Sequence, residues 1–169
     1  MKNALFFLHL FFNGGFVLAQ NAEKNKADIQ RFYEAFNQKD TNTIYSFYAP
    51  SVKFQMSGGR VFNLSIEMLK KTIEDNYKAF SDGKNEIINI VADGDWVSVC
   101  DRRTGTNSGS WMGVSAPGKM TDFLVMEMYR LQNGKIVEII LLQDNFTAFK
   151  QLGIIPAKIT GVLQNVEEK

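Results

Sequence analysis

The stretch from residue 119 to residue 156 constrains the fold more than any other part of the chain. It contains two apolar-rich runs separated by Asn133-Gly134. This pair favours a tight turn between two strands, because both turn residues must take a positive φ. The stretch therefore predicts a β-hairpin in which Gln132 pairs with Lys135. A short helix, Phe146 to Leu152, should follow it, and Gly153 should end that helix.

A regular two-residue turn determines which side chains share a face of the hairpin. Asp144 then lies across from Phe123, and Ile140 lies across from Glu127, all on the inner face. The outer face carries six apolar side chains, namely Leu124, Met126, Met128, Val137, Ile139 and Leu141. A bulge near Gly134 would exchange the two faces, so this assignment depends on a regular turn.

Several motifs, in order along the chain, resemble one protein family. Residues 134–138 (Gly-Lys-Ile-Val-Glu), then Asp144, then residues 151–153 (Gln-Leu-Gly) are similar to the C-terminal signature of the SnoaL-like polyketide cyclases, or ester cyclases. This family belongs to the nuclear transport factor 2-like superfamily. The resemblance continues upstream through residues 80–82, 92–95, 105–109, 112–114 and 117–119, and covers the chain from about Ile29 to Pro156.

The resemblance implies an α+β fold, a cone-shaped barrel in which three N-terminal helices cover the concave face of a curved, mostly antiparallel sheet. The apolar spacing agrees with this order of elements, because helical patterns precede most of the strand patterns. Helices are expected over Ala22–Lys39, from Asp40-Thr41 to Pro50, and after a cap at Ser65. Strands are expected at Val52–Met56, Arg60–Phe62, Glu86–Val91 and Trp96–Arg103.

The N-terminus predicts a signal peptide. Lys2 precedes an apolar run, Ala4 to Phe12, and Val17 and Ala19 occupy the positions that a signal peptidase reads. We therefore expect cleavage after Ala19 and a periplasmic or secreted protein. An uncleaved N-terminal anchor is the alternative, although the run is shorter than the roughly 20 apolar residues that span a bilayer. The domain would cover residues 20–169, with a core of about 25–156 and a tail of 157–169.

Composition excludes several classes of function. Cleavage would remove Lys2 and His9, the only histidine, from a chain with 19 basic and 18 acidic residues. The mature chain would be near neutral, so neither nucleic acid nor a membrane surface is an expected partner. Cys100 is the only cysteine and cannot form an intramolecular disulfide. With no histidine and one cysteine, a transition-metal site is not expected.

Asp144 is the first catalytic candidate, and Glu127 is the second. In the cyclases that this chain resembles, the Asp matching Asp144 removes or returns a proton in an intramolecular aldol ring closure, without metal or cofactor. That role suits a carboxyl in an apolar cavity, where desolvation raises the pKa. Asp144 could instead cap the helix that follows it. Glu127 could share a proton with Asp144, or form an ion pair with Arg102 or Arg130.

The candidate substrate-binding residues combine aromatic walls with a few polar groups. They are Phe36, Tyr48, Phe54, Arg102, Asn107, Trp111 and Phe123. Each ring taken singly also fits an ordinary core position. The chain departs from the cyclase pattern where Asn107 replaces the usual histidine and Ile140 replaces the usual tryptophan. These departures weaken the expectation of a cyclase activity.

Three functions are consistent with the sequence. The first is an exported, cofactor-independent enzyme of cyclase or isomerase type that acts on a small hydrophobic carbonyl compound. The second is a non-catalytic secreted protein that binds a small hydrophobic molecule in the same pocket. The third is an assembly module whose main product is its dimer. The apolar outer face predicts a homodimer. The rival cover for that face is the tail, with Ile159, Val162, Leu163 and Val166 at helical spacing.

Overall fold

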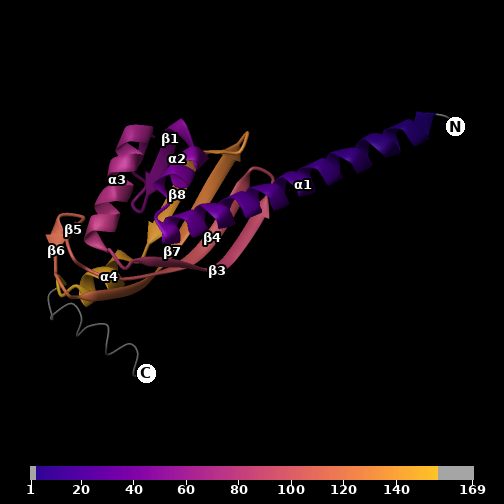
Figure 1. Ribbon diagram of the computed structural model, residues 1–169. Helices are drawn as coiled ribbons and strands as arrows, with labels where there is room; N and C mark the ends of the chain where they lie inside the picture. Colours follow the sequence, from indigo (N-terminus) through magenta and orange to yellow (C-terminus); the bar gives the residue numbers. More distant parts are fainter. Residues whose placement is uncertain (1–2, 156–169) are drawn as a thin grey trace, which may run out of the picture.

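The computed structural model describes residues 3–155, and their side chains from residue 21 onward. The described part folds into four helices and a six-stranded sheet (Figure 1). The helices are α1 (Asn3–Gln38), α2 (Thr41–Phe47), α3 (Ile66–Ala79) and α4 (Asn145–Gln151). The sheet contains β1 (Tyr48–Met56), β2 (Val61–Ser65), β3 (Lys84–Asp93), β4 (Trp96–Thr106), β7 (Met120–Gln132) and β8 (Lys135–Gln143). A separate short hairpin joins β5 (Ser110–Trp111) and β6 (Val114–Ser115).

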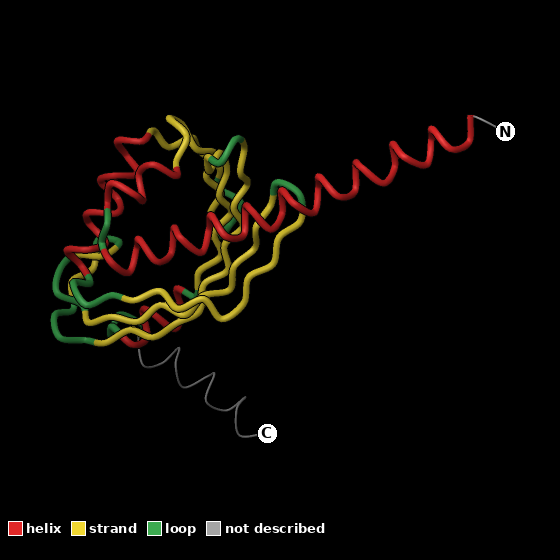
Figure 2. The backbone as a smooth tube through the Cα atoms, turned by 45° about the vertical axis from the view of Figure 1, so that its right-hand side comes forward, coloured by secondary structure: helices red, strands yellow, loops and turns green. Residues whose placement is uncertain are grey.

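The sheet is strongly curved, and its spatial order is β2-β1-β8-β7-β4-β3. Every neighbouring pair is antiparallel except β1 and β8, which run parallel. Figure 2 shows that the strands bend, and that helices lie on the concave side of the sheet. The expected fold, an α+β cone with three helices over the concave face, is confirmed.

The helices begin where the sequence predicts caps. Asp40 accepts a hydrogen bond from the Thr43 backbone N–H at 3.1 Å, and Ser65 accepts one from Met68 at 3.3 Å. The first helix is longer than expected, because it begins at Asn3 and runs without a break through residues 13–15. Its N-terminal part projects away from the rest of the protein (Figure 1). Among the described residues, no helix is both long and apolar enough to span a bilayer.

The hairpin turn forms as predicted, but the register beyond it is different. Asn133 and Gly134 have φ values of 51° and 72°, and Gln132 pairs with Lys135. Leu131 then pairs with Ile136 while Arg130 pairs with Glu138, so Val137 is an extra residue in β8. Beyond this bulge Glu127 lies opposite Leu141, not Ile140, and the predicted register is wrong.

The bulge changes which side of β8 faces the concave interior. Ile139 and Leu141 face inward, although the predicted register has them on the outer face. Glu138 faces outward, where its carboxylate meets Lys53 Nζ at 2.8 Å and Arg130 Nη2 at 2.9 Å. The three outward positions predicted on β7 are confirmed, since Leu124, Met126 and Met128 are exposed.

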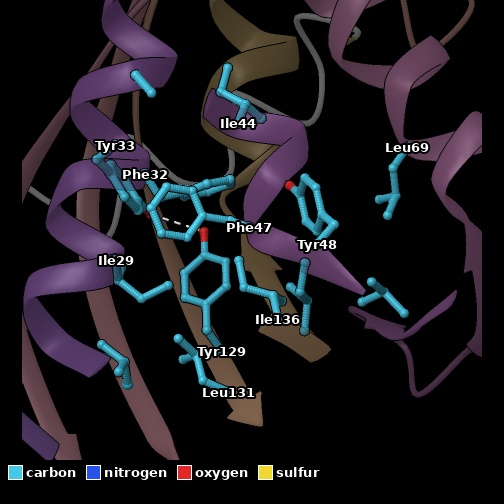
Figure 3. Packing of buried hydrophobic residues seen from close by; sticks show 14 of the residues in the cluster. Ile29, Phe32, Tyr33, Ile44, Phe47, Tyr48, Leu69, Tyr129, Leu131 and Ile136 are labelled. Carbon is cyan, nitrogen blue, oxygen red and sulfur yellow. Dashed lines mark hydrogen bonds between the residues drawn. The ribbon is translucent and has the colours of Figure 1, made fainter. Parts of the chain in front are cut away.

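The main core lies between α1, α2 and the concave side of the sheet. Phe32 of α1 is at its centre and makes edge-to-face contacts with rings from four elements, including Phe47, Tyr48 and Tyr129. Ring centroids in these pairs are 5.6–5.9 Å apart, which is the favoured geometry for aromatic pairs. Figure 3 shows that the Tyr129 ring points up from the sheet towards Phe32 and Tyr33. This packing holds α1 against the sheet and positions the polar groups described next.

Candidate functional site

A cavity of about 320 Å³ lies between the helices and the concave face of the sheet. Its size is at the lower end of the range for small-molecule pockets. Aromatic, aliphatic and methionine side chains form most of its wall: Phe32, Phe36, Tyr48, Phe54, Met56, Phe62, Leu64, Leu69, Ile73, Trp111, Met112, Ile139 and Leu141. The remaining lining groups are polar, and the charged ones gather at a single place.

That place is the buried polar cluster, which we define as Tyr33, Asp101, Arg103, Glu127 and Tyr129. One oxygen of Glu127, Oε2, accepts three hydrogen bonds. The donors are the Tyr33 hydroxyl at 2.8 Å, the Tyr129 hydroxyl at 2.5 Å and Arg103 Nη2 at 2.5 Å. Arg103 Nε also donates to Asp101 Oδ2 at 2.8 Å. Hydrogen bonds to charged groups of this kind are the strongest in proteins.

Strand alternation explains how the cluster comes together. Val97 and Val99 of β4 are fully buried, so Asp101 and Arg103 on the same strand point to the same concave side. Glu127 and Tyr129 are the inward positions of β7, the neighbouring strand. Tyr33 comes from the apolar stripe of α1 and reaches the cluster with its hydroxyl.

Burial and charge perturb the titration of this cluster. Burial, with a contribution from the Glu127 charge, raises the pKa of Tyr33 well above its usual value. The same two causes raise the pKa of Tyr129. Burial also raises the pKa of Asp101, and the Glu127 charge adds to this while Arg103 opposes it. Burial alone would lower the pKa of Arg103, but the carboxylates of Glu127 and Asp101 outweigh it and raise that pKa.

The two oxygens of Glu127 have different surroundings. Oε2 is held by the three donors, whereas Oε1 makes no hydrogen bond within the part of the chain whose side chains are described. Oε1 is not among the enclosed, unpartnered polar atoms of the described residues, and Glu127 lines the cavity, so a ligand there can approach this oxygen. The side-chain amides of Asn76 and Asn85 also line the cavity and have no hydrogen-bond partner among the described residues. The cavity therefore offers one fixed carboxyl oxygen and two amide groups to a ligand.

Most of the predicted pocket residues do line this space. Phe36, Tyr48, Phe54, Trp111 and the acid–base candidate Glu127 all line the main cavity. Phe123 lines a neighbouring cavity of about 110 Å³, which shares Phe36, Arg103 and Trp111 with the main one.

Asp144 lies outside both cavities. The sequence predicts its carboxyl in an apolar cavity, and this prediction is wrong. Asp144 is exposed and caps α4, where its Oδ1 accepts a hydrogen bond from the Thr147 backbone N–H at 3.0 Å. The Val137 bulge is the physical reason, because it turns Gln143 inward, opposite Val125, and so turns the next residue, Asp144, away from the cavity.

Arg102 and Asn107 also lie away from the cavities. Arg102 is on the convex side of β4, where it forms an ion pair with Asp122. Asn107 is buried and holds a loop together: its Oδ1 accepts a hydrogen bond from the Ala116 backbone N–H at 2.8 Å. The expected contacts of these two residues with a substrate are therefore not supported. Neither Arg102 nor Arg130 pairs with Glu127, because the partner is Arg103.

Only Glu127 of the buried polar cluster was a candidate site residue in the sequence, and four members were missed: Tyr33, Asp101, Arg103 and Tyr129. The sequence does contain a pattern that could have identified two of them, Asp101 and Arg103. Val97 and Val99 alternate with polar residues, and continuing this alternation places Asp101 and Arg103 inward and Arg102 outward. Tyr33 lies within the helix expected over Ala22–Lys39, and only the fold shows that its hydroxyl meets two carboxyls. Within the described residues, no three metal-ligating side chains come together.

A curved sheet closed by helices around an apolar cavity defines the nuclear transport factor 2-like class of α+β cones. Residues 27–152, which are more than half of the chain, match the model of the SnoaL-like polyketide cyclases. The chain therefore belongs to the SnoaL-like polyketide cyclase family, as the sequence motifs indicated.

Solved structures agree with this assignment. AclR of Streptomyces galilaeus, a proposed hydroxylase, is 26% identical with a TM-score of 0.71, over 80% of this chain and 99% of AclR. IdmH of Streptomyces antibioticus, a proposed polyketide cyclase, is 28% identical with a TM-score of 0.66, over 76% of this chain and 98% of IdmH. An LEH-like epoxide hydrolase of M. tuberculosis shares the fold at 15% identity and a TM-score of 0.62, over 88% of this chain and 98% of that one. No curated protein matches the sequence.

Proposed function

We propose that this chain is a cofactor-independent enzyme of cyclase or isomerase type, in which Glu127 moves a proton on a small hydrophobic carbonyl compound. One observation carries the proposal. Glu127 is held by three donors on Oε2 and presents Oε1, free of hydrogen bonds among the described residues, to an apolar cavity. A general base needs this arrangement, a carboxyl oxygen that is fixed in position and open to substrate.

The chemistry follows from the groups that line the cavity. Glu127 Oε1 would take a proton from the carbon next to a carbonyl, and the electron pair of the broken C–H bond would move onto the carbonyl oxygen. Asn76 and Asn85 would donate hydrogen bonds to that enolate oxygen. The enolate carbon would then form a carbon–carbon bond to a second carbonyl of the same molecule, whose oxygen takes the electron pair of its π bond and the proton held by Glu127. Alternatively, in a conjugated enolate, Glu127 would return this proton to another carbon. The first outcome is an aldol ring closure, and the second is an isomerisation.

The test uses a β-diketone that carries a phenyl ring, because its acidic C–H bond and flat ring suit the cavity. Exchange of this hydrogen for solvent deuterium, followed by NMR, measures proton removal without knowledge of the natural substrate. We expect Glu127→Gln to bind the probe but to slow catalysed exchange by about a hundred- to ten-thousand-fold. Asp144→Asn is the matched control, since it also neutralises one carboxyl but lies outside the cavity, and it should retain exchange.

The deuterium-exchange experiment also distinguishes the proposed enzyme from a non-catalytic binding protein. If the wild-type chain binds the diketone and does not accelerate exchange of its hydrogen, the alternative of a non-catalytic small-molecule-binding protein replaces the present proposal. The displacement of Asp144 from the cavity is the observation that favours this alternative. Circular dichroism of each variant checks that the fold is intact.

We further propose that the chain is exported and that cleavage follows Ala19. The support is the charged, apolar and small-residue pattern of residues 1–19, together with the projection of the N-terminal part of α1 away from the body (Figure 1). Mass spectrometry of protein recovered from the periplasm or the medium should find Gln20 as the first residue. An intact Met1 in that fraction would contradict the proposal.

We propose finally that the protein forms a homodimer through the convex face of the sheet. Four large apolar side chains of β7 and β8 gather there, and they are 39–56% exposed: Leu124, Met126, Met128 and Leu142. A contiguous apolar patch of this kind favours a self-complementary contact about a two-fold axis. Leu142 lies opposite Met126 on this face, where the predicted register has Leu141.

A further inference from the structure

The buried polar cluster contains more close oxygen contacts than its two phenols can supply with protons. Tyr33 O lies 3.0 Å from Asp101 Oδ1 and 2.8 Å from Glu127 Oε2. Tyr129 O lies 2.5 Å from the same Glu127 oxygen. These three contacts need three protons, because a hydroxyl has only one to donate. The two hydroxyls also lie 3.3 Å from each other, but this longer contact takes no proton when both hydroxyls donate to Glu127. Tyr33 and Tyr129 supply two, so a carboxyl must supply the third.

The donors around Glu127 and Asp101 decide which of these two carboxyls carries the third proton. Glu127 Oε2 is already surrounded by three donors, Tyr33, Tyr129 and Arg103, so a proton carried by this oxygen would meet theirs. Asp101 Oδ1 has Tyr33 as its one hydrogen-bond partner among the described residues, while Oδ2 accepts from Arg103 Nε. The Asp101 side chain is fully buried, which disfavours a second anion beside Glu127.

We propose that Asp101 is protonated at neutral pH and that its proton directs Glu127. Asp101 Oδ1 donates to the Tyr33 oxygen, and the Tyr33 hydroxyl in turn donates to Glu127 Oε2. The charge of Arg103 then balances that of Glu127 alone, and the cluster is neutral as a whole. Asp101 is in this way a positioning residue, since it lines neither cavity and acts through Tyr33, Arg103 and Glu127. This inference deepens the proposed function and rests on it for its relevance to turnover.

The groups around Asp101 agree with a proton on this carboxyl. Tyr33 approaches from α1, Arg103 lies on the same strand, and Glu127 comes from β7. On β3, the residue paired with Asp101 is the apolar Ile87. Burial is the largest effect on this group and raises the pKa of Asp101, and the Glu127 charge acts in the same direction. Arg103 opposes both, but its charge is shared with Glu127.

Carboxyl-carbon NMR of the full chain with isotopically labelled aspartate tests the proposal directly. The Asp101 signal is identified by its loss in Asp101→Asn. We expect the wild-type signal at the chemical shift of a protonated acid at neutral pH, with its titration midpoint at higher pH. Tyr33→Phe removes the oxygen that accepts this proton and should move the midpoint to lower pH. Tyr129→Phe is the matched control, because Tyr129 contacts Glu127 and not Asp101, and it should move the midpoint less.

Two results would overturn the proposal. One is a carboxylate shift for Asp101 at neutral pH. The other is a midpoint that Tyr33→Phe moves to higher pH, which would show that Tyr33 donates to Asp101. Thermal unfolding gives an independent readout if Tyr33→Phe does not fold. Asp101→Asn resembles the protonated acid and should keep the wild-type melting temperature, whereas a drop of roughly 10 °C would indicate the loss of an ionised partner of Arg103.

These measurements need no substrate. A carboxylate signal for Asp101 would therefore refute the proton assignment and leave the role of Glu127 standing. Conversely, unchanged deuterium exchange in Glu127→Gln would refute the proposed function and leave the proton on Asp101.

Discussion

Asp144 and Glu127 show how much the role of a carboxyl depends on its position in the fold. Both were candidates in the sequence, and the motif around Asp144 made it the stronger one. The fold exposes Asp144 at the start of α4 and buries Glu127 beside the cavity. The sequence contained the alternation that brings Asp101 and Arg103 inward, but Glu127 was matched with Arg102 or Arg130. Only the pairing of β4 with β7 shows that the ion-pair partner of Glu127 is Arg103.

The cap at Asp144 leads to a prediction about stability. Asp144→Ala leaves the Thr147 N–H without its acceptor and should lower the free energy of unfolding by about 0.5–2 kcal/mol. Asp144→Asn should stay near the wild type, because asparagine caps helices as well as aspartate does. Urea denaturation at neutral pH measures both values. A folded Asp144→Asn variant that loses deuterium exchange would restore the catalytic role that the family resemblance implied.

At the level of elements, the hairpin illustrates both what the sequence predicts and where the prediction ends. Asn133-Gly134 predicts the turn because its φ requirements are local. The bulge at Val137 has no such local marker, since residues 135–137 read as an ordinary strand. Its physical reason is tertiary. A regular register would turn Glu138 towards Tyr129 in the aromatic core, whereas the bulge turns it outward to Lys53 and Arg130.

The turn itself can be tested by substitution of Gly134, which has a φ of 72°. A side chain in this left-handed region costs about 1–2 kcal/mol, so Gly134→Ala should lower the free energy of unfolding by about that amount. The cost is conformational, since the nearest atom to an added Cβ, Lys24 Nζ, is at an ordinary distance of 3.7 Å. Gly134→Asn is the control and should be less destabilising, because asparagine tolerates positive φ better than alanine does. Equal losses for the two variants would mean that the turn conformation is not what limits stability.

On the scale of the whole molecule, the placement of the helices explains why one face of the sheet is left apolar and uncovered. The first three helices close the concave side, and α4 packs against Phe123 and Trp111. In the described residues no helix covers Leu124, Met126 and Met128, which remain exposed on β7. Residues 157–169, the rival cover considered in the sequence, lie outside the described residues. The arrangement of the cone thus concentrates large apolar side chains on the surface opposite the cavity.

This surface gives the last prediction, which concerns the oligomer. Sedimentation at micromolar concentration should find the mature chain as a dimer, because burying these side chains against a second copy removes apolar area from water. Met126→Lys places a charge in the middle of the patch and should shift the protein to monomers. Val61→Lys is the control, since Val61 is 51% exposed but lies on β2, at the far end of the sheet order, and should leave the dimer intact. A wild-type monomer that is unchanged when residues 157–169 are deleted would exclude both the dimer and cover by the tail, because the patch would then be stably exposed to water.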